Sequence, residues 1–114
     1  NRGIRAHWHF AGIGPDLERL KRLVLRLQLS DSVTFHQSVG ASALGALYRE
    51  CHLFVLASVG SSGGIEPVET QGVVLQEAQA SGCIPIATAV GGIPECVRDG
   101  VDGILVADRS HRAI

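Results

Sequence analysis

Two glutamates stand eight residues apart in the stretch "ETQGVVLQEAQASGCIPIATAVGGIPE", at Glu69 and Glu77. Between them runs a short segment that opens on Gly72 and is mostly apolar. Burial in a protein core accounts for the apolar residues, but it does not account for two carboxylates at a fixed spacing. The two glutamates are therefore the first candidates for chemistry.

The segment from Gly72 onward has the pattern of a helix, and the start of that helix is suited to binding an anion. The amides of Gly72, Val73 and Val74 have no partner within the helix, and the helix dipole adds partial positive charge there. Glu77 would lie about 7 Å further along the axis, at roughly 1.5 Å per residue. A carboxylate there would repel a diphosphate but could accept two hydrogen bonds from a vicinal diol such as a ribose. Glu69 would face whatever lies beyond the phosphates.

This order of groups predicts one extended ligand made of a ribose, a diphosphate and a sugar. The simpler alternative is that Glu77 is a solvated helix residue and Glu69 a charge on a loop or in a first helical turn. The apolar neighbours Val74 and Ala78 argue against plain solvation of Glu77.

A glycine pair, Gly12 and Gly14, forms a second candidate site in the stretch "GIGP". Glycines between a strand and a helix start allow a phosphate or ribose to approach the backbone. The dinucleotide fingerprint G-x-G-x-x-G fails, because Leu17 takes the place of the third glycine. His36 stands where a ribose-binding acid would end the next strand. NAD binding is thus disfavoured, and a tight structural turn remains the alternative.

Other reactive side chains lack the partners that their chemistry needs. His7 and His9 share a strand face but have no third ligand near in sequence, so we predict no metal site and no cofactor. Ser58 has no base beside it, and the three cysteines form no C-x-x-C pair. An odd number of cysteines without such a pair indicates reduced thiols and a cytoplasmic protein.

Short apolar runs alternate with helical periodicity along the 114 residues. This pattern predicts an α/β fold, a doubly wound, Rossmann-like parallel sheet with about five strands in one domain over residues 1–114. Ligands of such sheets bind beyond the carboxyl ends of the strands, where all these candidates fall. The expected strands are residues 6–12, 32–36, 53–58, 84–88 and 103–106, and the expected helices are residues 15–29, 42–51, 72–81 and 94–99.

The composition narrows the class of protein further. Apolar residues make up 46% and charged residues 18%, which is typical of a globular chain. A net charge of −1 gives no basic face for nucleic acid. The longest apolar runs are too short to cross a bilayer, so we expect no transmembrane segment.

The run "ETQGVVLQEAQASGCIPIATAVGGIPECVRDGVDGILV" resembles the C-terminal domain of retaining glycosyltransferases of the GT-B fold, the large group 1 (family 4). The family's E-x7-E motif is matched by Glu69 and Glu77, and its G-G-x-x-E by "GGIPE". Upstream, "FAGIGPDLERLKRL" and "VTFHQSV" are similar to further family segments. Four positions depart from the family pattern: Ala57 replaces a proline, Thr70 a glycine, and His36 and Gln37 an aliphatic–glycine pair.

The resemblance implies a donor site for a nucleotide sugar. By analogy, the catalytic Glu69 would contact the sugar hydroxyls and Glu77 the ribose diol. The amides of residues 72–75, from Gly72 through Val73 and Val74 to Leu75, would hold the diphosphate. The turn from His36 to Val39 would lie near the base, and Gly12 and Gly14 would line the nucleotide pocket.

The same resemblance implies that the chain is a partial domain, truncated at both ends, of a two-domain hexosyltransferase that needs no metal. Its partners would be the nucleotide-sugar donor and an N-terminal acceptor-binding domain, and alone it would transfer no sugar. An exposed sheet edge would favour self-association. The cytoplasm is the expected location, with a peripheral place at the inner membrane face as an option for the full protein. Alternatives are a nicotinamide-binding half of a Rossmann-type enzyme and a non-catalytic relic domain.

Overall fold

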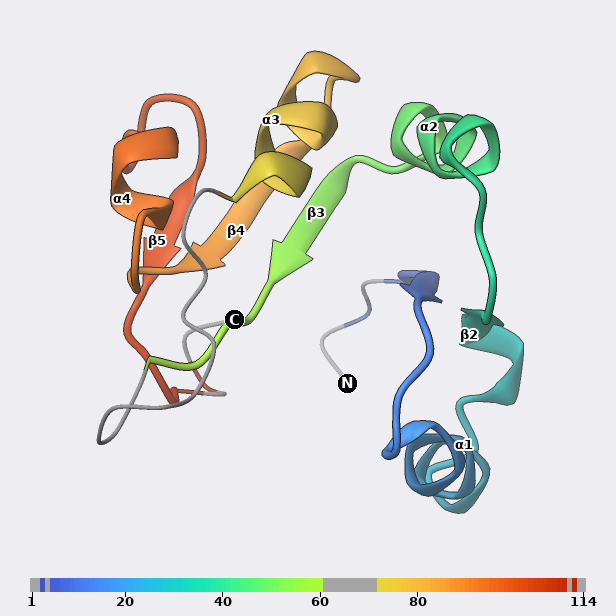
Figure 1. Ribbon diagram of the computed structural model, residues 1–114. Helices are drawn as coiled ribbons and strands as arrows, with labels where there is room; N and C mark the ends of the chain where they lie inside the picture. The colour runs from blue at the N-terminus through green and yellow to red at the C-terminus, as the bar shows by residue number, and fades with distance from the viewer. Residues whose placement is uncertain (1–2, 4, 61–71, 111, 113–114) are drawn as a thin grey trace. The chain divides into compact units, whose positions relative to one another are not determined.

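The computed structural model describes residues 3, 5–60, 72–110 and 112. The chain divides into two compact units, residues 1–44 and 45–114, and each unit is described by itself. All strand pairs in both units are parallel. The expected α/β class is therefore confirmed, with five strands in a sheet of two and a sheet of three (Figure 1).

The first unit contains a two-stranded sheet with a helical crossover. Strand β1 (Trp8–Ala11) pairs with β2 (Val33–His36), and the register places Ala11 opposite His36. The crossover consists of α1 (Leu17–Arg26) and the 3-10 turn η1 (Ser30–Ser32). On one face of the sheet, Phe10 stacks on Trp8 and on Phe35, with ring centroids 6.4 and 5.4 Å apart.

Helix α1 is shorter than the sequence pattern predicts. It begins at Leu17 and ends at Arg26, because Gln28 adopts a left-handed backbone (φ 56°) that stops a right-handed helix. Leu27, which lies inside the predicted helix of residues 15–29, is the C-terminal cap of α1 and is 54% exposed.

Helix α2 (Ala41–Glu50) runs across the boundary between the units at residues 44 and 45. Its C-terminal half packs in the second unit, where the Tyr48 ring meets the Phe54 ring edge-on at 5.5 Å between centroids. Strand β3 (Leu53–Leu56) follows directly, two residues shorter than expected.

The second unit is built on a three-stranded sheet in the order β3-β4-β5, with β4 (Ile84–Thr88) in the middle and β5 (Ile104–Val106) at one side. Helix α3 (Val73–Ala80) crosses from β3 to β4, and the short α4 (Ile93–Cys96) lies between β4 and β5. Both helices bury apolar side chains against the sheet. The core cluster is formed by Leu75, Ala87, Ile93 and Val97.

The C-terminus of α3 lies within one residue of the predicted helix end at residue 81. Gly82 has a left-handed φ of 94°, and its amide donates to the Gln79 carbonyl at 3.0 Å. The next amide, of Cys83, donates to the Ala78 carbonyl at 3.0 Å. These two bonds satisfy carbonyls at the helix end and turn the chain into β4.

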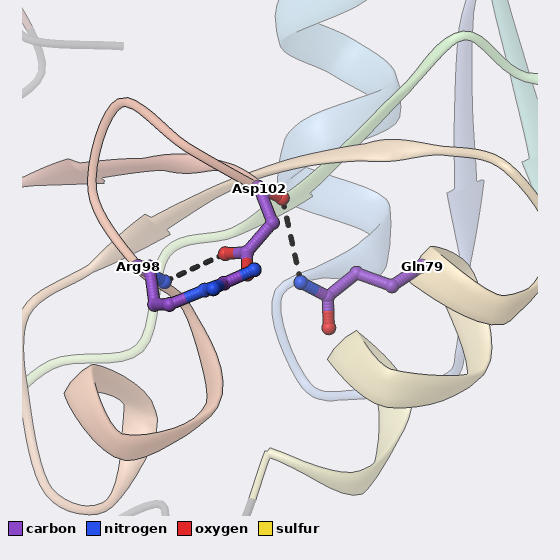
Figure 2. A network of polar contacts seen from close by, with 3 residues as sticks. All are labelled: Gln79, Arg98 and Asp102. Atoms are coloured by element: carbon purple, nitrogen blue, oxygen red, sulfur yellow. Dashed lines mark hydrogen bonds and ion pairs between the residues drawn. The ribbon is translucent and has the colours of Figure 1, made fainter.

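The turn before β5 is fixed by the network in Figure 2. The Asp102 carboxylate accepts from the Arg98 backbone N–H at 2.7 Å and from the Arg98 Nε at 2.6 Å. The Gln79 amide donates to the Asp102 carbonyl at 3.4 Å, which joins α3 to this turn. The hydrogen bonds from Arg98 also lower the pKa of the Asp102 carboxyl.

In the part of the chain that the structure describes, none of the helices has the length and hydrophobicity that crossing a membrane requires.

Candidate functional site

The N-terminus of α3 begins from a backbone position that suits glycine. Gly72 is buried and left-handed (φ 53°), and a Cβ added there would lie 2.9 Å from the Leu75 Cδ1 atom. The Gly72 carbonyl accepts from the Leu75 amide at 2.8 Å. The amides of Val73 and Val74 belong to the first helical turn, where N–H groups have no carbonyl partner inside the helix.

Glu77 lies one turn into α3 with an exposed side chain. Its carboxylate forms no hydrogen bond or ion pair with another described residue. Burial raises the pKa of the Tyr48 hydroxyl, and the negative charge of Glu77 raises it further. Glu77 is thus solvent-exposed in the second turn of α3, which fits a diol-binding carboxylate and equally fits the solvated helix residue named as the alternative.

Glu69, the other member of the glutamate pair, lies outside the described residues, as does Thr70. The role expected for Glu69 stays a prediction from sequence.

The first unit brings the other candidates together at the carboxyl end of β1 and β2. The Gly12 amide donates to the His36 carbonyl at 2.9 Å, so the glycine turn is joined to the end of β2. Gly12 has a φ of 141°, and a Cβ at Gly12 or Gly14 would meet no heavy atom within 4 Å. Open space thus lies beside both glycines. Val39 follows three residues after His36 and is half-buried.

A cluster of imidazoles lies on the same sheet, on β1, β2 and the residue before β1. His9 Nδ1 and His36 Nε2 are 2.9 Å apart, and His7 Nε2 is 2.8 Å from the Thr34 hydroxyl. Among the described residues, no three or more His, Cys, Asp or Glu side chains are grouped so that they could hold a metal ion. The histidine pair is therefore best described as a hydrogen bond between neighbouring strands.

Several polar residues that were not predicted as site residues lie together at the carboxyl ends of β3, β4 and β5. The Asp108 carboxylate accepts from the Gly60 amide at 3.1 Å, and Arg109 donates to the Gly60 carbonyl at 3.1 Å. The Thr88 hydroxyl donates to the Ser58 carbonyl at 2.5 Å. The signal in the sequence was that Asp108 lies two residues after the end of a predicted strand.

Known proteins resemble this chain closely enough to assign a family. All of residues 1–114 match the family described as glycosyl transferases group 1. D-inositol 3-phosphate glycosyltransferase of Streptomyces griseus is 42% identical over 96 residues, which cover 84% of this chain and 19% of the relative. The chain thus spans about a fifth of the length of that relative.

Two solved structures share the fold. HepE from Anabaena, in complex with UDP-glucose, has a TM-score of 0.72 and 25% identity over 91% of this chain and 28% of its own. The C-terminal domain of LpcC, a group 1 glycosyl transferase from Francisella tularensis, has a TM-score of 0.64 and 29% identity over 85% of this chain and 48% of its own. The match to a C-terminal domain agrees with the resemblance drawn from the E-x7-E and G-G-x-x-E patterns. The chain belongs to the group 1 glycosyl transferases and has the fold of their C-terminal domain.

Proposed function

We propose that this chain binds the nucleotide-sugar donor of a glycosyltransferase that moves the sugar to an acceptor with retention of configuration. The observation that carries the proposal is the α3 N-terminus, with its left-handed Gly72 and with Glu77 exposed one turn along the helix. Family membership supports the same reading. So does HepE, a relative in fold whose structure contains UDP-glucose.

Each part of the donor has a group suited to it. The amides of Val73 and Val74, with the helix dipole, stabilise the diphosphate and the charge that develops on it as it leaves. The Leu75 amide already donates to Gly72, so it reaches a phosphate only as a shared donor. Glu77 accepts two hydrogen bonds from the ribose diol. Glu69 contacts the sugar hydroxyls.

In the first unit, the nucleotide lies beside the glycine turn. Gly12 and Gly14 leave open space, and the Gly12 amide donates to the His36 carbonyl, which joins the glycine turn to the end of β2. The backbone from His36 to Val39 then faces the base. Transfer to an acceptor requires a second, acceptor-binding domain in the full-length protein, and no metal ion or cofactor is expected to take part.

The test is nucleotide binding by the full-length protein and by Glu77→Gln. UDP, GDP, ADP and NAD are titrated by calorimetry. We expect one nucleoside diphosphate to bind, and Glu77→Gln to weaken it about tenfold or more, because a charged acceptor for two hydroxyls is lost.

Glu50→Gln serves as the matched control. Glu50 ends α2, is exposed, and lies away from the α3 N-terminus in sequence, so its variant should bind as the wild type does. Binding of NAD alone would favour the nicotinamide alternative. Equal affinity of wild type and Glu77→Gln would remove Glu77 from the site.

A further inference from the structure

Three side chains hold the backbone of the residues that follow β3. The Thr88 hydroxyl donates to the Ser58 carbonyl at 2.5 Å, and the Asp108 carboxylate accepts from the Gly60 amide at 3.1 Å. The Arg109 guanidinium donates to the Gly60 carbonyl at 3.1 Å. Thr88 ends β4, and Asp108 and Arg109 follow β5. We call Thr88, Asp108 and Arg109 the clamp, because together they tie the chain after β3 to the ends of the two other strands.

The clamp acts where the sheet no longer holds the chain. The pairing of β3 with β4 ends at Leu56 and Ala87, so Ser58 and Gly60 lie beyond it. Figure 1 shows the chain after β3 beside the chain after β5, as the two contacts with Gly60 require. The clamp therefore extends the fixed backbone from the end of β3 as far as Gly60.

The clamp includes features that an ordinary turn does not need. Arg109 has a left-handed backbone (φ 58°), which is an uncommon and unfavourable conformation for a residue other than glycine. Thr88 is only 4% exposed, so its hydroxyl is a buried polar group that needs its hydrogen bond. A Cβ at Gly60 would lie 2.9 Å from Asp108 Oδ2, which favours glycine at this position. Backbone strain of this kind is concentrated at functional sites.

The clamped backbone leads to the residues that carry the first glutamate of the E-x7-E pattern. Glu69 lies nine residues after Gly60 and three before Gly72, outside the described residues. Because the chain is continuous, residues 61–71 start where the clamp holds Gly60 and end at Gly72, the buried N-cap of α3. Functional residues are often carried on connecting segments that a rigid scaffold positions. Fixing both ends limits the positions that are open to Glu69.

We propose that the clamp consists of positioning residues, which hold Ser58 and Gly60 and thereby place Glu69 against the sugar of the donor. The proposal rests on the proposed function, which assigns the sugar hydroxyls to Glu69 and the diphosphate to the α3 N-terminus. The clamp acts on the donor only through Glu69. Its loss therefore weakens the binding of the sugar and leaves the binding of the diphosphate unchanged.

The experiment measures how much tighter the full-length protein binds a sugar nucleotide than the matching free diphosphate. UDP-glucose, UDP-galactose, UDP-N-acetylglucosamine and GDP-mannose are titrated beside UDP and GDP by calorimetry. We expect one sugar nucleotide to bind the wild type about tenfold tighter than its diphosphate. Thr88→Val keeps the shape of the side chain but removes the hydroxyl. It should lower this affinity ratio about threefold or more, with the affinity for the diphosphate unchanged.

Further variants separate positioning from a general loss of stability. Thr88→Ser retains the hydroxyl and should restore the wild-type ratio. In a protein that already carries Glu69→Gln, Thr88→Val should not change the ratio further, because effects that act through one residue are not additive. Thr34→Val is the matched control, since the Thr34 hydroxyl contacts His7 at 2.8 Å and not the clamp, and it should keep the wild-type ratio. Where Thr88→Val does not fold, Arg109→Ala takes its place, because Arg109 is exposed.

The proposal is overturned if Thr88→Val keeps the wild-type ratio, whether both affinities stay the same or fall together as they would in a loosened fold. Additive effects of Thr88→Val and Glu69→Gln also overturn it, and so does a ratio that Thr88→Ser does not restore. A wild type that prefers no sugar nucleotide over its diphosphate has the same consequence. Absence of binding to every nucleotide would instead reject the proposed function itself.

Discussion

At the scale of single residues, Glu77 and Asp108 show what a sequence can and cannot reveal about a site. The position of Glu77 on α3 was predictable, because its spacing from Gly72 is local and helix geometry converts that spacing into a position. Asp108 was not, because its partner Gly60 is 48 residues away and only the folded sheet brings them together. Contacts of that kind leave no periodic signal in the sequence.

The three cysteines give a prediction about reactivity. Cys83 is buried, and its thiol donates to the Tyr48 carbonyl at 2.9 Å. Burial raises the pKa of the Cys83 thiol, and the nearby Cys51 adds to the shift. Since the thiolate is the reactive form, we expect iodoacetamide at pH 8 to modify Cys83 at least tenfold more slowly than the half-buried Cys51 and Cys96.

Mass spectrometry over time measures the three rates after digestion with a protease that cleaves after glutamate, because Glu77 and Glu95 lie between the cysteines and place each of them on a separate peptide. The same reaction in denaturant provides the control, because all three thiols should then react alike. Equal rates in the native protein would contradict the burial of Cys83.

At the scale of helices and strands, the sequence predicted the order and type of elements because each has a strong local pattern. Gly82 correctly indicated the end of α3, because glycine adopts the left-handed backbone conformation found at helix ends without steric cost. The end of α1 was missed because Gln28 adopts the same conformation without being glycine. The observed strand ends also differ from the predicted ones, because apolar residues continue past the last backbone hydrogen bond between the strands.

The packing of Gly103, the residue before β5, against Pro85 of β4 can be tested at this scale. A Cβ at Gly103 would lie 2.6 Å from the Pro85 Cγ and the Val97 Cγ1, and 2.9 Å from the Pro85 carbonyl oxygen. Backbone and core atoms cannot move aside easily, so Gly103→Ala should lower the free energy of unfolding by about 1–3 kcal/mol. Urea denaturation measures the change.

Gly40→Ala is the matched control, because a Cβ there would meet no heavy atom within 4 Å. It should change the stability by less than about 0.5 kcal/mol. Equal stability of Gly103→Ala and wild type would show that β5 does not pack on β4 as described.

At the scale of the whole molecule, family membership was predictable from motifs that span most of the chain, and the full-chain family match confirms it. The candidate site was predictable only in part. Its residues fall in two units, with Gly12 and His36 in one and Gly72 and Glu77 in the other, and no local pattern fixes how such parts combine. The chain also covers only 19% of the length of a related glycosyltransferase.

The measurement that tests the central claim most directly is an amide NMR titration of the full-length protein, labelled with ¹⁵N-glycine and ¹⁵N-valine. UDP, GDP, ADP and NAD are added in turn. We predict that one nucleoside diphosphate changes the chemical shifts of the Gly72, Val73 and Val74 amides and of the Gly12 amide. The chemical shift of the Gly103 amide should stay unchanged. The donor site proposed for this chain would be contradicted if none of the diphosphates shifted any amide signal. It would also be contradicted if the amide signals at the α3 N-terminus stayed unchanged while others shifted.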